Sequence, residues 1–143
     1  MIGIIISLIS GALMSIQGVF NTRVTESAGL WLTNTIVQGS AFLVCLIALA
    51  LTKDGNINGL RDVNKLYLLG GVLGAGITYT VIKGIDSLGP AYAIMLILIA
   101  QMSLAYLIEL FGWFGSKSPG FEWHKLIGVA FMIGGIVVFQ WKK

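Results

Sequence analysis

Residues 89–112 read Gly-Pro-Ala-Tyr-Ala-Ile-Met-Leu-Ile-Leu-Ile-Ala-Gln-Met-Ser-Leu-Ala-Tyr-Leu-Ile-Glu-Leu-Phe-Gly, and this stretch decides the fold. It is long and apolar enough to cross a bilayer as one helix, and its proline suits the first turn of that helix. Gln101 lies near the middle, and Glu109 follows two turns later. At about 3.6 residues per turn, Gln101, Ala105 and Glu109 share one face of the helix. We therefore predict a membrane-spanning helix with a polar stripe that faces protein or water.

Glu109 supports two interpretations. A carboxylate at membrane depth costs on the order of 2.5–3.5 kcal/mol to insert, so a deep position indicates a functional role. Glu109 is also close enough to the helix end, near Trp113, to reach the membrane interface as an anchor. The sequence leaves both interpretations open.

Composition predicts an all-α integral membrane protein. Of the 143 residues, 57% are hydrophobic and 10% charged, and the mean hydropathy is +0.92. A soluble globule needs more polar surface than this. The nine Lys and Arg are scattered beside apolar runs, as membrane-flanking charges are, so the net charge of +3 does not indicate nucleic-acid binding. Cys45 is the single cysteine, which excludes an intramolecular disulfide and a cysteine metal cluster.

Five apolar stretches predict one domain of five transmembrane helices. The Ala-Gly pair at 28–29 ends or bends the first helix, and residues 87–90 form a tight turn into the fourth. Glycines at 70 and 74 form a small-xxx-small pair, which predicts close packing of the third helix against a neighbour. The predicted spans are residues 2–22, 30–51, 66–86, 90–114 and 125–141.

Amide side chains mark faces of the first two spans. Gln17 and Asn21 lie on one face of the first helix, either as a ligand-facing wall or as interhelical hydrogen-bonding groups. Asn34 and Gln38 are four residues apart in the second helix. Their face is able to join that of Gln17 and Asn21, but their position near the membrane edge favours solvation at the interface.

The flanking charges give almost no orientation signal. Five spans place the two ends of the chain on opposite sides of the membrane. One side holds Lys53, Arg61, Lys65, Lys117 and Lys125, and the other holds Arg23, Lys83, Lys142 and Lys143. Such a weak positive-inside bias predicts insertion in both orientations, with opposite copies paired about an axis in the membrane plane. The alternative is a fixed orientation and an oppositely oriented partner chain.

Several motifs resemble the short YdcZ-like members of the drug/metabolite transporter superfamily, and the resemblance covers nearly the whole chain. Two departures stand out: Glu109 replaces the aspartate expected in many relatives, and Ala100 replaces a glycine. The first departure preserves an acid. The matching motifs are GALMSIQGVFN at 11–21, GGVLGA at 70–75, LGPA at 88–91, AQMSL at 100–104, ELFG at 109–112, IGVA at 127–130 and GGIV at 134–137.

The resemblance implies a five-helix half-unit of a ten-helix inverted-repeat transporter in the bacterial inner membrane. Such a protein moves a small organic solute by alternating access at a cavity between two inverted units. Small multidrug relatives carry a glutamate in their first helix for proton/cation exchange, where this chain has Gln17. The resemblance alone therefore does not bring that exchange to this chain. If transport is coupled to protons, Glu109 is the candidate carrier, buried against Gln101 and Tyr106.

The leading hypothesis is an antiparallel homodimer that transports small solutes. Alternatives are a non-transporting membrane subunit that needs an oppositely oriented partner chain, a small multidrug-type cation/proton exporter, or a channel. No nucleophile and base pair, phosphate loop or metal-ligand pattern supports an enzyme, a cofactor or a metal, and His124 is interpreted as interfacial. The predicted substrate-binding residues are Gln17, Asn21, Gln38, Gln101, Tyr106 and Glu109.

Overall fold

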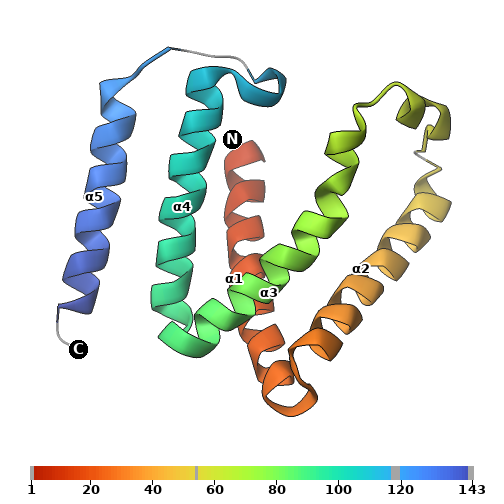
Figure 1. Cartoon of the computed structure of the whole chain (residues 1–143), viewed down its shortest axis with the longest axis horizontal. Helices are drawn as coiled ribbons and strands as arrows, with labels where there is room; N and C mark the ends of the chain where they lie inside the picture. Colours follow the sequence, from red (N-terminus) through yellow and green to blue (C-terminus); the bar gives the residue numbers. More distant parts are fainter. Residues whose placement is uncertain (1, 54, 117–119, 142–143) are drawn as a thin grey trace. The chain divides into compact units, whose positions relative to one another are not determined.

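The computed structural model describes residues 2–53, 55–116 and 120–141, and within these ranges it contains helices and no strand (Figure 1). Five helices, with a 3-10 turn preceding the third, are long and apolar enough to cross a membrane. The predicted all-α, five-span membrane fold is therefore confirmed. The α-helices are α1 (Ile2–Ala28), α2 (Leu30–Thr52), α3 (Gly70–Leu88), α4 (Pro90–Phe111) and α5 (Trp123–Gln140).

Three short 3-10 helices complete the chain: η1 (Ile57–Arg61), η2 (Lys65–Leu69) and η3 (Trp113–Gly115). η2 runs directly into α3, so the apolar span there covers Lys65–Leu88. In the α2–α3 connection, the side chains of Asn56 and Asn64 cap η1 and η2 by accepting backbone N–H groups. Lys117, Lys142 and Lys143, three of the flanking cations counted above, lie outside the described residues.

The helix bounds differ from the predicted spans mainly at α1 and α4. α1 continues past residue 22 to Ala28 because no glycine or proline occurs before Gly29 in this stretch, and Arg23 pairs with Glu26 one turn later at 3.1 Å. α4 ends at Phe111, before residue 114, because Gly112 adopts the left-handed conformation (φ 64°, ψ 27°) and caps the helix. Glu109 consequently lies in the last turn of α4.

Single glycines form two of the connections between helices. Gly29 links α1 to α2 with φ 81° and ψ 155°, and Gly89 links α3 to α4 with φ 78° and ψ 158°. This backbone region is essentially restricted to glycine, because a Cβ clashes there. The Gly29 N–H donates to the Thr25 carbonyl at 2.9 Å, and the Gly29 carbonyl accepts the Thr33 N–H at 3.1 Å, so this glycine bonds to both helices. At the second corner the Gly89 carbonyl accepts the Ala93 N–H of α4 at 3.1 Å.

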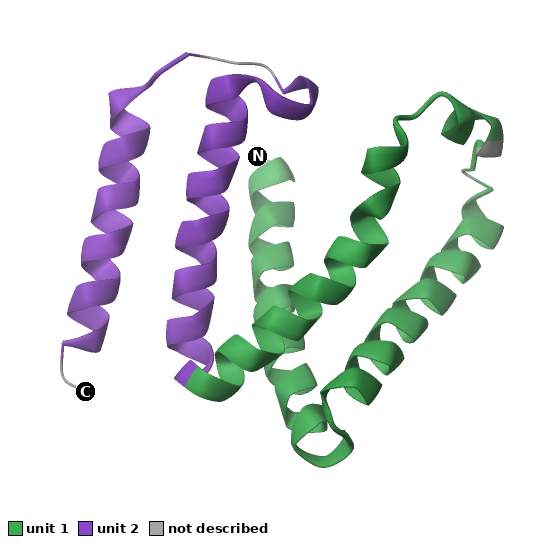
Figure 2. Cartoon of the chain, in the orientation of Figure 1, with its two compact units in different colours: residues 1–87 green, residues 88–143 purple. Residues whose placement is uncertain are grey.

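The helices group into two compact units, residues 1–87 and residues 88–143 (Figure 2). In the first unit, α1 approaches α3 at Gly18, where an added Cβ would lie 2.7 Å from Ile85 Cδ1. Of the predicted pair, Gly74 lies beside α2, where an added Cβ would be 3.8 Å from Gln38 Nε2, whereas a Cβ at Gly70 would meet nothing within 4 Å. Ile82 and Ile85 of α3 supply the buried apolar side chains beside this contact.

The buried side chains of the first unit include several polar ones. Asn21, Thr22, Thr33 and Asn34 are each at most 8% exposed. The hydroxyls of Thr22 and Thr33 donate to the carbonyls four residues earlier, both at 2.9 Å, which satisfies them within their own helices. The two asparagines must find partners elsewhere.

The corner glycines yield a stability prediction. Gly89→Ala forces a Cβ into a backbone region that only glycine occupies readily, at an expected cost of about 1–3 kcal/mol. Side-chain crowding does not contribute, because an added Cβ meets nothing within 4 Å. The measurement is the free energy of unfolding in mixed detergent micelles. Gly39→Ala, inside α2 and equally uncrowded, is the matched control and should be neutral or stabilising by up to about 1 kcal/mol. Equal effects of the two substitutions would contradict the prediction.

Candidate functional site

α1 carries the first group of predicted site residues. Gln17 is exposed and Asn21 is buried, and both line a shallow, open hollow of about 420 Å³ on α1 together with Met14 and Phe20. The Gln17 side-chain amide has no hydrogen-bond partner among the described residues. The two amides lie one turn apart on an otherwise apolar helix. Polar groups at such positions are unusual in a membrane unless a polar partner covers them.

α2 and α3 are joined by a polar seam. Asn34 Nδ2 donates to the Ala75 carbonyl at 2.9 Å, and Gln38 Nε2 donates to Thr78 Oγ1 at 3.1 Å. Trp31 and Tyr79 extend the seam with ring centroids 5.4 Å apart. The expectation that Asn34 and Gln38 are solvated at the membrane interface is wrong, because both amides bond to α3.

Asn34 is the most buried amide of the seam, at 3% exposed, and its Oδ1 is buried without a hydrogen-bond partner among the described residues. An unpaired buried acceptor typically costs about 1–3 kcal/mol. A water or a ligand N–H or O–H group would relieve this cost. The sequence prediction did not include Asn34 among the site residues, although its spacing of four from Gln38 was the available signal.

Gln101 lies at the centre of α4 as the twelfth residue of the 22-residue helix. Its side chain is exposed, and its amide has no partner within the described part of the chain. Glu109, eight residues later, is not packed against Gln101 as expected. Its side chain is 49% exposed and its carboxylate pairs with Lys125 at 3.0 Å.

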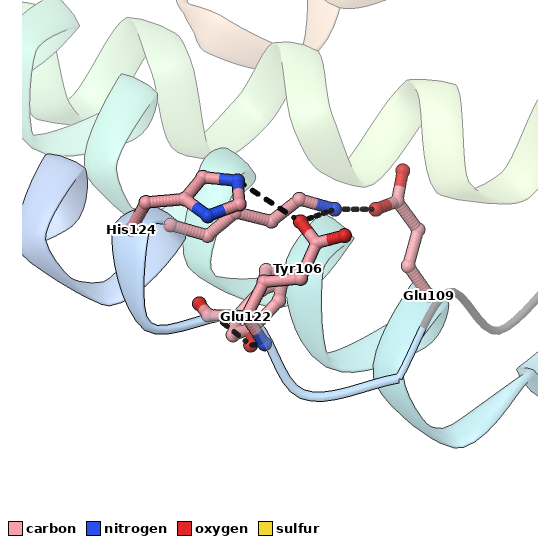
Figure 3. A network of polar contacts seen from close by, with 5 residues as sticks. Tyr106, Glu109, Glu122 and His124 are labelled. Carbon is pink, nitrogen blue, oxygen red and sulfur yellow. Dashed lines mark hydrogen bonds and ion pairs between the residues drawn. The ribbon is translucent and has the colours of Figure 1, made fainter.

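The ends of α4 and α5 meet in a charged network (Figure 3). Lys125 Nζ lies 3.0 Å from Glu109 Oε2 and 3.3 Å from Glu122 Oε2, so one ammonium bridges two carboxylates. His124 Nε2 lies 3.1 Å from the same Glu122 oxygen. Glu109 comes from the last turn of α4, whereas the other three residues surround the start of α5. The network therefore ties the two helices together at one end.

Tyr106 contacts two residues of this network. It is 8% exposed, and its hydroxyl accepts the Glu122 N–H at 3.1 Å and lies 3.4 Å from the Glu122 carbonyl (Figure 3). Lys125 Nζ lies 5.5 Å from the centroid of its ring, within the range of a cation–π interaction. One buried aromatic ring thus positions both the residue preceding α5 and the bridging ammonium.

A groove of about 400 Å³ runs along α4 and α5 from this network, and we call it the α4–α5 groove. Tyr106, Glu109 and Lys125 form its polar end. The remaining walls are apolar and come from Met102, Ala105, Gly128, Val129 and Met132. Within residues 2–53, 55–116 and 120–141, no group of three His, Cys, Asp or Glu side chains is arranged to hold a metal.

The structure thus distributes the six predicted residues over four places. Gln17 and Asn21 share the hollow on α1, Gln38 lies in the α2–α3 seam, and Tyr106 and Glu109 lie in the α4–α5 groove. Gln101 is on an uncovered face of α4. Sequence reasoning missed Lys125, which it counted as a flanking cation, and it missed Glu122. Their spacing of three at a helix start was the signal that they share a face.

Comparison with known families gives one match. The family model described as "Putative inner membrane exporter, YdcZ" matches residues 2–138, nearly the whole chain. No curated protein and no solved structure matches this sequence.

The Tyr106 hydroxyl yields a second stability prediction. Tyr106→Phe leaves the Glu122 N–H without its acceptor, so unfolding in mixed micelles should become easier by about 0.5–1.5 kcal/mol. Tyr92→Phe is the matched control, because the Tyr92 hydroxyl has no partner in the described part of α4 or elsewhere in the described ranges. A Tyr106→Phe protein as stable as the control would show that the hydroxyl does not hold the start of α5.

Proposed function

Because the chain belongs to the YdcZ family of inner membrane exporters, we propose that it exports a small organic solute by alternating access, as an antiparallel pair of two copies. Each copy supplies five spans, and two inverted copies supply the ten helices of an inverted-repeat transporter. In this arrangement the solute binds in a cavity between the copies. The cavity opens in turn to either side of the membrane.

The observation that carries this proposal is the uncovered amide of Gln101. It lies at the centre of an apolar span and has no partner among the described residues. In hydrocarbon an unpaired amide is costly, so this face of α4 requires a polar or hydrated environment. Gln17 on α1 presents the same requirement. A second copy that covers both faces and encloses water would meet it, and the same groups would then bind a solute.

The charge distribution supports the antiparallel arrangement. Five spans carry the chain an odd number of times across the membrane, and the flanking cations divide five against four. The positive-inside rule then gives almost no preference between the two orientations. Copies inserted both ways would pair about an axis in the membrane plane, as the two halves of larger transporters do.

We assign solute contacts to the polar groups that line the faces described above. Gln17, Asn21 and Gln101 offer amide donors and acceptors, and Asn34 adds a buried acceptor that lacks a partner. Gln38 positions Thr78 across the α2–α3 seam. Tyr106 and Glu109 supply an aromatic ring and a carboxylate at the end of the α4–α5 groove.

The orientation of the chain is the first prediction from this proposal. Ser27→Cys and Asn58→Cys, each in a Cys45→Ser background, place one thiol beyond either end of α2 at an exposed position. With both orientations present, a membrane-impermeant maleimide should label about half of each variant in spheroplasts and all of it after permeabilisation. Full labelling of one position and none of the other would show a fixed orientation and would overturn the homodimer in favour of a partner chain.

The second prediction concerns export itself. Cells that express the protein should show, by untargeted mass spectrometry, solutes whose ratio of extracellular to intracellular amount rises. Gln101→Leu should reduce that rise about tenfold, the effect of losing roughly one hydrogen bond to the solute. Gln140→Leu, the same change in the last residue of α5, is the control and should leave export unchanged. A profile that does not depend on expression would contradict export, and full export by Gln101→Leu would remove Gln101 from the site.

A further inference from the structure

The polar end of the α4–α5 groove already holds an ammonium group, that of Lys125. We propose that this groove binds the exported solute, that the solute is an amphipathic organic ammonium ion, and that Lys125 is a tethered competitor that fills the ammonium position in its absence. The inference rests on the export function proposed above and names its substrate class. It shares Tyr106 and Glu109 with the site assigned there.

The position of Lys125 shows what the polar end accepts. Its Nζ lies 3.0 Å from Glu109 and 3.3 Å from Glu122, and 5.5 Å from the centroid of the Tyr106 ring. Two carboxylates and an aromatic face are the groups that recognise an alkylammonium ion. Lys125 enters this position from α5 with a side chain that is 32% exposed, so it is not locked in place by packing. A flexible four-carbon stem allows it to swing out toward the surface.

The local charge favours a cation over an anion. Glu109 and Glu122 contribute two negative charges and Lys125 one positive charge, which leaves one net negative charge when His124 is neutral. A solute ammonium therefore replaces the Lys125 ammonium without changing the net charge of the group, whereas a carboxylate or phosphate would meet net repulsion. When the solute ammonium takes the place between the carboxylates, Lys125 leaves it, so the site never holds two unpaired acids.

The groove walls match the apolar body of such a solute. Met102, Val129 and Met132 line it, and Gly128 leaves its floor open, since a Cβ there would meet nothing within 4 Å. Methionine side chains are flexible and polarisable, so they adapt to differently shaped apolar groups. A volume of about 400 Å³ suits a small arylalkyl or alkyl body.

The direction in which Lys125→Met changes the affinity for the solute shows whether Lys125 competes with the solute or only holds α4 and α5 together. Lys125→Met keeps the length of the stem and removes the ammonium. If Lys125 competes with the solute, the apparent affinity rises because the site is no longer self-occupied. A site occupied by Lys125 about nine-tenths of the time would bind about tenfold tighter after the change. If Lys125 only clamps α4 to α5, the same substitution loosens the groove and weakens binding.

The experiment is isothermal titration of the purified protein in dodecyl maltoside micelles with 4-phenylbutylammonium. We expect saturable binding, about tenfold tighter for Lys125→Met and at least about tenfold weaker for Glu109→Gln, which removes one of the two carboxylates. Lys83→Met, at an exposed lysine of α3, is the matched control and should bind as the unaltered protein does. The anion 4-phenylbutyrate carries the same apolar body and should not bind.

A second variant keeps the test decisive if Lys125→Met does not fold. Lys125→Arg retains the ion pairs and adds bidentate geometry, so it should be harder to displace and should weaken ammonium binding relative to the unaltered protein. Weaker binding by a folded Lys125→Met, tighter binding by Lys125→Arg, or a preference for the anion would each overturn the proposal. Occupation of the groove by phosphatidylethanolamine alone, with no binding of the probe, would overturn it as well.

Flux across proteoliposomes distinguishes this inference from the function on which it rests. The expected affinity order together with efflux of 4-phenylbutylammonium supports both. The expected order without efflux supports the ammonium site and overturns export. Expression-dependent export of other solutes from cells, with no ammonium binding, overturns the inference and leaves the export function in place.

Discussion

The hydrogen-bonding requirement of the peptide backbone in hydrocarbon is the constraint on which the rest of this structure depends. Each N–H and C=O that enters the membrane must be paired inside the chain, because lipid offers no partner. Long helices meet this requirement along the five spans. The connections at Gly29 and Gly89 are short, and the carbonyl of each glycine accepts an N–H of the helix that follows.

The polar side chains obey the same constraint in different ways. Serine and threonine hydroxyls donate to carbonyls of their own helices, as Ser10 does to Ile6 and Thr22 to Gly18. Asn34 and Gln38 instead bond across to α3. Apart from Asn34 Oδ1, which lacks a partner among the described residues, these groups are paired within the first unit. Gln17 and Gln101 have no such partner among the described residues.

In the second unit, the charged side chains form ion pairs at a helix end. Glu109, Glu122 and Lys125 meet where α4 ends and α5 begins. This location agrees with the interfacial interpretation of Glu109 that the sequence left open. The carboxylate also lines the polar end of the α4–α5 groove and shares the Lys125 ammonium with Glu122. Tyr106, buried beneath, fixes the geometry of both.

The sequence by itself determined the helical class, the five spans and the polar character of particular helix faces. These follow from local properties: apolar length, helical periodicity and the conformations that glycine and proline permit. Only the tertiary structure decided which polar group meets which. Lys125 pairs with Glu109 across 16 residues and Asn34 with Ala75 across 41, and the close approach occurs at Gly18 and not at Gly70. Such pairings depend on how helices lean and rotate against each other, and small residues and amides permit many of these arrangements. The periodicity of a single helix therefore names the face that carries a polar group, while the packing of its neighbours selects the partner.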